Sequence, residues 1–114
     1  MIIQYYVLRS GRCEVKDFID GLLPKQKAKI FRLFQAIEVY GMITVTPHIK
    51  KLSNSELWEL RILGKDSIRL FYIIFNKDNV IIFHGFIKKT NKTPMKELRL
   101  AENIFHEWKN RVDK

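Results

Sequence analysis

The sequence predicts an α+β fold, in which an antiparallel sheet carries helices packed on one side. Two stretches with apolar residues at helical spacing follow a short apolar N-terminal segment, and three strand-like segments come later, joined by short turns. One more helical stretch completes the order β-α-α-β-β-β-α. A chain of 114 residues leaves no room for two domains, so we expect residues 1–114 to form a single domain.

The N-terminal half predicts one strand and two helices. Residues 2–8 are short, apolar and rich in strand-forming side chains, so we expect a strand there. Apolar residues at helical spacing predict a short helix that begins near Val15 and closes around Gly21, and a longer helix from Pro24 to about Tyr40. Residues 42–55 are expected to form a loop.

The C-terminal half predicts three strands and a helix. In residues 57–63 the side chains alternate along the segment, which is typical of a strand with two different faces. Turn-forming residues separate this segment from strands expected over 68–75 and 80–87, and the last of these is apolar enough to be covered on both faces. After Pro94, helical spacing predicts a final helix that runs to about Arg111.

Positive charge is the first indication of function. The chain has 21 Lys and Arg against 12 Asp and Glu, a formal net charge of +9 at pH 7. An excess of this size on a small domain favours a polyanionic partner, because each neutralised phosphate releases counterions. A basic surface that is merely solvated is the alternative. Two basic stretches without acidic residues, 25–32 and 88–96, hold part of the charge.

Cysteine usage and hydropathy indicate the compartment. Cys13 is the one cysteine, so no intramolecular disulfide forms and a reducing cytoplasm suits the chain. The longest apolar run, residues 70–75, is far shorter than the roughly 20 residues that span a bilayer. The N-terminal residues lack the pattern of a signal peptide. We therefore expect a soluble cytoplasmic protein that does not contact membranes.

Two arginines are the strongest candidates for a functional site. Arg61 and Arg69 lie on two expected strands joined by a tight turn, so they can lie close together on the sheet. The planar guanidinium presents a fork of donors that suits phosphate oxygens. The alternative is that Arg61 forms ordinary surface ion pairs with Glu59 or Glu56.

Lysines near these strands extend the candidate surface. Lys88, Lys89 and Lys92 follow the last expected strand, although lysines at such a place often only protect a sheet edge. Lys50 and Lys51 lie in the loop expected before the strands. We treat Lys50, Lys51, Lys88 and Lys92 as candidate RNA-binding residues.

Histidine and metal chemistry receive less support. His84 lies in an apolar strand, where a hydrogen-bonded structural role is more common than that of a general acid or base. His48 lies just before the basic loop residues, and His106 falls on the surface of the last helix. The histidines and Cys13 show no metal-ligand spacing, so no zinc site is expected. The sequence also lacks phosphate-loop, dinucleotide-binding and serine-hydrolase motifs.

Three stretches of the sequence form a set with a specific order and spacing. They are Leu57-Trp58-Glu59-Leu60-Arg61-Ile62, then Ile68-Arg69-Leu70-Phe71-Tyr72, and then the run F-H-G-F-I-K-K-T-N-K-T-P over residues 83–94. Together they resemble the phage-derived HigB-like toxins of the RelE/ParE superfamily. The resemblance covers about residues 48–110.

This resemblance implies the compact RelE-like fold, of microbial-ribonuclease type, and the toxin of a type II toxin–antitoxin system. It implies an endoribonuclease, an mRNA interferase that cuts translated mRNA on the ribosome without a metal or organic cofactor. A ribose 2′-OH would attack the adjacent phosphate. The implied partners are mRNA, the ribosome and a HigA-like helix-turn-helix antitoxin encoded nearby, which would form a hetero-oligomer with the toxin.

The resemblance also assigns roles to individual residues. Arg61 and Arg69 match family positions on the sheet that contact the scissile phosphate, and Lys89, with Lys88 beside it, matches the basic position after the last strand. We therefore expect Arg61, Arg69 and Lys89 to be catalytic.

The general base is left open. Some relatives have a second basic residue where Glu59 stands, and some have a tyrosine where Pro94 or Met95 falls. Glu59, Lys89 and His84 are the candidates for acid–base chemistry, and the ribosome can also supply positioning that compensates for a poor base.

Two other functions agree with the same residues. The chain can be a basic nucleic-acid-binding module without catalysis, whose arginines only hold phosphates. It can also be an interaction subunit whose basic face receives an acidic antitoxin or regulator.

Overall fold

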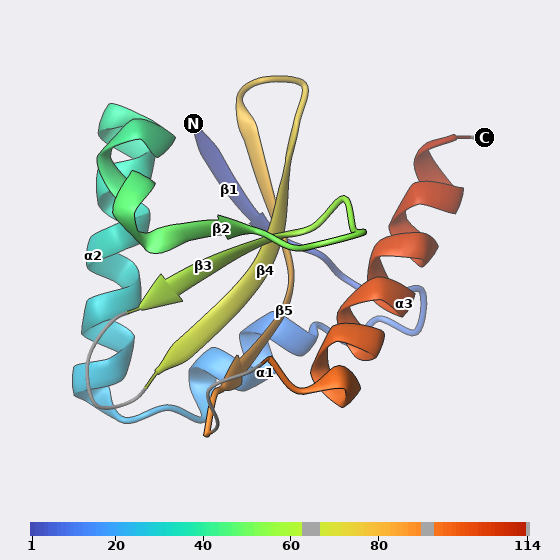
Figure 1. Cartoon of the computed structure of the whole chain (residues 1–114), viewed down its shortest axis with the longest axis horizontal. Helices are drawn as coiled ribbons and strands as arrows, with labels where there is room; N and C mark the ends of the chain where they lie inside the picture. Colours follow the sequence, from blue (N-terminus) through green and yellow to red (C-terminus); the bar gives the residue numbers. More distant parts are fainter. Residues whose placement is uncertain (63–66, 90–92, 114) are drawn as a thin grey trace.

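The computed structural model describes residues 1–62, 67–89 and 93–113 (Figure 1). Three α-helices, one 3₁₀-helix and five strands are assigned within these ranges. In chain order they are β1 (Ile2–Tyr5), α1 (Glu14–Asp20), α2 (Pro24–Tyr40), η1 (Met42–His48), β2 (Ile49–Lys51), β3 (Trp58–Ile62), β4 (Ile68–Phe75), β5 (Asn79–Ile87) and α3 (Met95–Val112).

The five strands form one sheet in the order β1-β5-β4-β3-β2. The ladders that join β2 to β3, β3 to β4 and β4 to β5 are antiparallel, whereas β1 pairs with β5 in parallel. The α+β class is thus confirmed. The parallel edge strand was not expected from the sequence.

Alternate residues of the central strand β4 belong to two separate cores. Leu70 and Tyr72 pack in one core with α1 and α2. Phe71 and Ile73 pack in the other with residues of α3. The predicted packing of helices on one side of the sheet is therefore seen for α1 and α2, and α3 packs on the residues of the opposite face, away from α2 in Figure 1.

Gly85 permits the close packing of α1 on β5. A Cβ atom at this position would lie 2.5 Å from the Phe18 ring and 2.7 Å from the Leu70 side chain. Real Cβ atoms do not approach other atoms so closely, so a side chain here would push α1 away from the sheet.

The expected loop over residues 42–55 is wrong in its first part. Met42–His48 form a 3₁₀-helix with Pro47 inside it, and Ile49–Lys51 form the edge strand β2. Short side chains support the 3₁₀ turns, because the hydroxyls of Thr44 and Thr46 donate to backbone carbonyls three residues earlier. A strand of three residues carries too short a pattern to be recognised from the sequence alone.

Two element boundaries also differ from expectation. The N-terminal strand ends at Tyr5 and not at residue 8, although the Tyr6 amide still donates to the carbonyl of Ile82. The strand expected over 57–63 is β3, which begins at Trp58 and ends at Ile62; residue 63 lies outside the described residues. The expected strand over 68–75 and the helices that begin at Pro24 and after Pro94 are confirmed.

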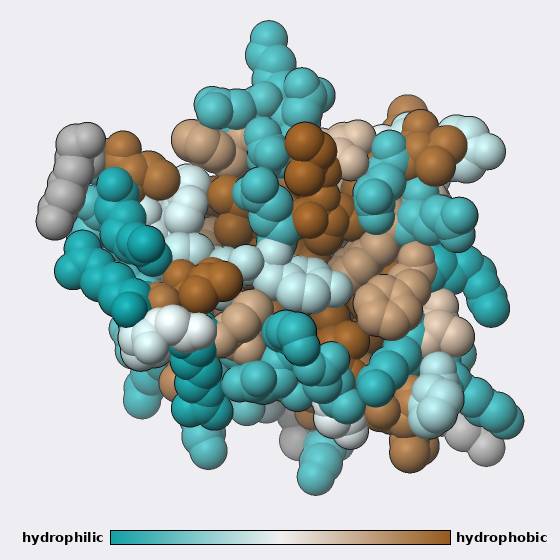
Figure 2. Space-filling model, turned by 180° about the vertical axis from the view of Figure 1, so that it is seen from behind, coloured by the Kyte–Doolittle hydropathy of each residue, from teal (hydrophilic) through white to brown (hydrophobic). Residues whose placement is uncertain are grey.

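The reverse face of the molecule is mixed in character. Figure 2 shows hydrophilic side chains around the rim and apolar side chains gathered toward its middle. None of the helices in the described part of the chain has the length and apolar character that crossing a bilayer requires.

Candidate active site

The two arginines face each other across the β3–β4 ladder. Arg61 is the direct register partner of Arg69. Both lie on the face that carries α3, because Arg69 is two residues from Phe71, which packs in the α3 core. The Arg61 side chain keeps 35% of its surface exposed, whereas that of Arg69 keeps 10%. The predicted proximity of the two residues is confirmed.

A buried carboxylate lies between the two guanidinium groups. The Glu59 side chain is 2% exposed, and its Oε1 atom lies 3.5 Å from Arg61 Nε and 3.3 Å from Arg69 Nε. The Thr93 hydroxyl donates a hydrogen bond of 3.0 Å to the other oxygen, Oε2. This cluster of one anion and two cations keeps a net positive charge.

Arg69 lies in an unusual environment for an arginine. Burial lowers the pKa of its guanidinium, the Glu59 carboxylate raises that pKa, and Arg61 lowers it again. The group remains charged, because an arginine does not lose its proton in a protein. Its Nη1 atom donates to the carbonyl of Ile68 at 3.1 Å. Among the described residues its buried Nε finds no aligned hydrogen-bond acceptor, so its contact with Glu59 is an ion pair.

A basic cleft of about 590 Å³ opens beside this cluster. Glu59 and Arg61 contribute to it from β3, and Lys50 stands opposite Glu59 in the β2–β3 ladder. Among the described residues, the lining is Lys50, Leu52, Ser53, Glu59, Arg61, Lys88, Thr93 and Leu98. Three of these are cations, and they surround a cleft between the sheet and the start of α3; Arg69 is buried next to it without lining it.

Not all of the predicted basic residues meet at this cleft. Lys51 follows Lys50 along a strand and so points to the opposite face, where its ammonium lies 6.0 Å from the centre of the Trp58 ring. Lys89 is exposed just after β5 and does not line the cleft. Lys92 lies outside the described residues. Lys50 and Lys88 are the lysines that the structure brings to Arg61.

His84 is buried and serves as a link between β5 and α3. Its Nε2 atom lies 2.5 Å from Glu97 Oε2, and its ring stacks on Phe86. The residue does not line the cleft. This arrangement agrees with the structural role that the sequence favoured. His106 is exposed on α3, as expected.

Sequence reasoning missed four of these cleft residues. Thr93 was quoted only as part of a motif, and Leu52, Ser53 and Leu98 were not singled out for this site. Thr93 immediately precedes Pro94, the N-cap residue of α3, so it lies just before the first turn of that helix. Its position within the long basic motif is the signal by which it could have been found.

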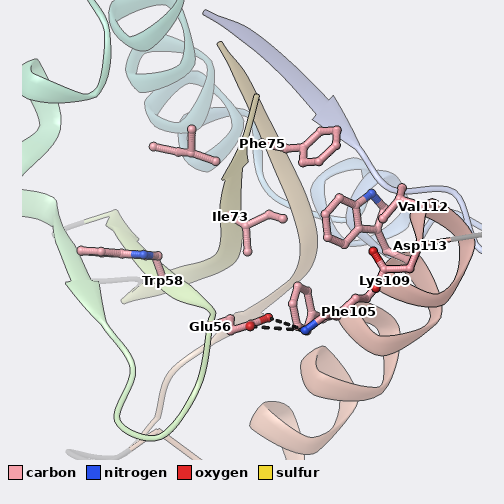
Figure 3. A pocket seen from close by; sticks show the side chains of 10 residues that line it. Glu56, Trp58, Ile73, Phe75, Phe105, Lys109, Val112 and Asp113 are labelled. Carbon is pink, nitrogen blue, oxygen red and sulfur yellow. Dashed lines mark hydrogen bonds and ion pairs between the residues drawn. The ribbon is translucent and has the colours of Figure 1, made fainter. Parts of the chain in front are cut away.

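An apolar groove lies on the other side of the segment that joins β2 to β3 (Figure 3). Its volume is about 430 Å³, and its walls include Ile73, Phe75 and Phe105. The joining segment contacts α3 at two points: the Ser55 hydroxyl bonds to Glu102, and Glu56 lies 3.4 Å from Lys109 Nζ. These contacts separate the apolar groove from the basic cleft.

Within the described ranges, no group of three or more His, Cys, Asp or Glu side chains is arranged to hold a metal ion. The basic cleft presents guanidinium, ammonium, hydroxyl and carboxylate groups. Such a set binds anions and can stabilise negative charge that develops on a phosphate.

The fold and the cleft together define a small basic α+β domain with a paired-arginine site on one face of its sheet. A family model described as phage derived protein Gp49-like (DUF891) matches residues 17–106. The chain belongs to this family, which is a family of RelE/ParE-like toxins. The predicted superfamily is thus confirmed. A comparison with curated proteins finds no match.

Proposed function

We propose that this chain is the toxin of a type II toxin–antitoxin system of the HigB-like kind and that it cleaves mRNA. Membership of a RelE/ParE-like toxin family supports the toxin role. The observation that carries the proposed chemistry is the direct pairing of Arg61 with Arg69 beside a basic cleft.

In the proposed reaction, a ribose 2′-oxygen attacks the adjacent phosphorus and the bond from phosphorus to the 5′-oxygen breaks. The 2′-hydroxyl proton leaves to a base, and the departing 5′-oxygen takes up a proton. The products are a 2′,3′-cyclic phosphate and a 5′-hydroxyl. Negative charge grows on the phosphate oxygens in the transition state, and fixed guanidinium groups stabilise that charge without reorganisation.

Each basic residue has a distinct place in this proposal. Arg61, which lines the cleft, contacts the scissile phosphate, and the buried Arg69 adds positive potential from beside it. Lys50 and Lys88 bind neighbouring phosphates as point charges. Lys89, exposed beyond β5, approaches the RNA when it is bound and is a candidate acid for the leaving oxygen.

The proposed partners follow from the same role. An acidic antitoxin with a helix-turn-helix domain would neutralise the basic cleft, since complementary charge speeds association. Translated mRNA on the ribosome is the proposed substrate, and the ribosome would orient the RNA so that a weak base suffices.

The test is induction of wild type, Arg69→Ala, Arg69→Lys and Lys77→Ala in bacteria at matched levels of folded protein. Wild type should arrest growth and leave cut sites with 5′-hydroxyl ends, mapped by primer extension. Arg69→Ala should lower cleavage on the order of 10²-fold, because it removes fixed positive charge beside the phosphate and one of the two cations that hold Glu59. Arg69→Lys should recover part of the activity, because the lysine keeps the positive charge but not the geometry of the guanidinium contact with Glu59.

Lys77→Ala is the matched control, because Lys77 is a cation in the turn that follows β4. It should change cleavage only a few-fold through diffuse charge. Equal toxicity of wild type and Arg69→Ala would remove Arg69 from the site. RNA binding by wild type without any cleavage would support the non-catalytic binding module instead.

A further inference from the structure

Glu59 places a carboxylate in a site that is proposed to bind phosphate, which is itself negatively charged. A carboxylate repels a phosphate, and this one lies on the floor of the cleft next to Arg61. It is also nearly fully buried, which is costly for an ion unless partners compensate. Such a residue needs a role that outweighs both costs.

The geometry does not favour proton abstraction by Glu59. Its Oε1 atom lies within 3.5 Å of Nε atoms from two guanidinium groups, and its Oε2 atom accepts the hydrogen bond from Thr93. A general base needs an oxygen within hydrogen-bond reach of the substrate hydroxyl. Both oxygens of Glu59 already face protein groups.

We infer that Glu59 is a positioning residue that holds the arginine pair in place for RNA cleavage, an inference that rests on the proposed function. Arg61 and Arg69 are direct ladder partners and would repel each other. The carboxylate between their Nε edges offsets this repulsion and fixes both side chains. The terminal nitrogens of Arg61 then remain available to a phosphate in the cleft.

Thr93 extends this positioning to the start of α3. Its hydroxyl fixes Glu59 Oε2, and the next residue, Pro94, caps the helix. A second polar contact, between His84 and Glu97, ties the first turn of α3 to β5. The placement of α3 and the orientation of the arginine pair are therefore coupled through Thr93 and Glu59, so a partner that moves the start of α3 also disturbs the arginines.

The experiment compares wild type, Glu59→Gln, Thr93→Val and Thr46→Val as full-length chains. Thr93→Val keeps the shape of the side chain and removes the hydroxyl. Thr46→Val is the matched control, since it makes the same change at an exposed threonine of η1 that does not line the cleft. Two measurements are made: the NMR signals of the arginine Nε–H groups in the free protein, and kcat, KM and the pH–rate profile on an oligoribonucleotide or on ribosome-bound mRNA.

Glu59→Gln should shift the Nε–H signals of Arg61 and Arg69 and lower kcat about tenfold, the scale of one lost charge-assisted contact. KM should not rise, because a negative charge has left the cleft. The pH–rate profile should keep its shape. Thr93→Val should shift the same signals and lower kcat a few-fold, while Thr46→Val should leave both unchanged.

Unmoved Nε–H signals in both variants would overturn the inference. So would loss of the acidic limb of the pH–rate profile in Glu59→Gln, because that result identifies Glu59 as the base. If Glu59→Gln does not fold, Thr93→Val decides the question. The NMR measurement needs no activity, so a wild type that does not cleave RNA would reject the proposed function and still leave the positioning role open to test.

Discussion

The basic cleft and the apolar groove both lie between the sheet and α3, yet they are built from opposite kinds of side chain. The cleft collects Lys50, Arg61 and Lys88 around one buried carboxylate. The groove is walled by aromatic and aliphatic side chains, with the ion pair of Glu56 and Lys109 at its edge. One helix thus serves two purposes: its start completes a charged site, and its second half anchors the helix through apolar packing.

This difference predicts that substitutions at the groove affect stability, whereas substitutions at the cleft affect the proposed cleavage of RNA. The buried hydrogen-bonded and ion-paired groups of the cleft fix the direction of side chains. The aromatic rings of the groove supply apolar contact area. Three substitutions on the groove side test this separation, from the largest expected effect to the smallest.

Phe105→Ala should have the largest effect on stability. Phe105 is 3% exposed and packs edge-on against Phe83 and stacked on Trp108. Truncation of a buried phenylalanine costs about 3–5 kcal/mol through lost transfer energy and a cavity. Chemical denaturation should show this loss in the free energy of unfolding. Phe31→Ala, which truncates a half-exposed phenylalanine of α2, is the control and should cost much less.

Tyr6→Phe should have an intermediate effect that depends on pH. The Tyr6 hydroxyl donates to Glu107 at 2.6 Å and accepts from Arg111 at 3.1 Å, so it ties the segment after β1 to α3. Its removal should lower the free energy of unfolding by about 1.5–3 kcal/mol at neutral pH, the usual contribution of a hydrogen bond to a charged group. Cleavage by the folded protein should not change.

The pH dependence follows from the titration of the same hydroxyl. Burial raises the pKa of Tyr6, and the bond to Glu107 raises it further, against a smaller lowering by Arg111. The folded pKa thus lies above the unfolded value of about 10, so this stability is complete below about pH 10 and is lost as the pH rises above it. Denaturation at neutral pH and above pH 10 should show a smaller alkaline loss for Tyr6→Phe than for wild type. An equal loss would contradict the assignment.

Lys109→Ala should have the smallest effect. The ion pair of Lys109 with Glu56 joins side chains that are 44% and 61% exposed, and such surface pairs contribute about 0.2–1 kcal/mol. Thermal denaturation at low and high salt should show a small loss that salt reduces. Lys16→Ala, which breaks the exposed pair with Asp20 on α1, is the matched control. A large loss of the proposed cleavage in Lys109→Ala would mean that the apolar groove and the basic cleft do not act independently.

Local patterns predicted most of the fold. The strand over 68–75 and the helix from Pro24 to Tyr40 carry long, regular patterns, and both are found with these bounds. The edge strand β2 is too short to show a pattern. Its omission had a direct consequence for the site: once Lys50 and Lys51 are placed on a strand, they must point to opposite faces, and only Lys50 reaches the cleft.

The candidate site was predictable only where neighbouring strands determine it. The proximity of Arg61 and Arg69 follows from their places on two strands that are neighbours in the chain and pair in the sheet. The contact of Glu59 with Thr93 does not, because it joins β3 to a residue that follows β5. The buried state of Glu59 depends on how the start of α3 lies over the sheet. A local sequence pattern does not predict the position of a helix relative to a sheet.

The parallel pairing of β1 with β5 has a consequence for the order in which the molecule folds. Strands β2 to β5 form successive antiparallel ladders between near neighbours in the chain. By contrast, Ile2 of β1 pairs with Asn79 of β5, which lies far away in the sequence. Contacts between such distant residues cost more chain entropy than contacts between neighbouring strands, and they form more slowly. The antiparallel ladders of β2 to β5, which include the arginine pair, are therefore expected to form first. The pairing of β1 with β5 then completes the sheet at a late stage of folding.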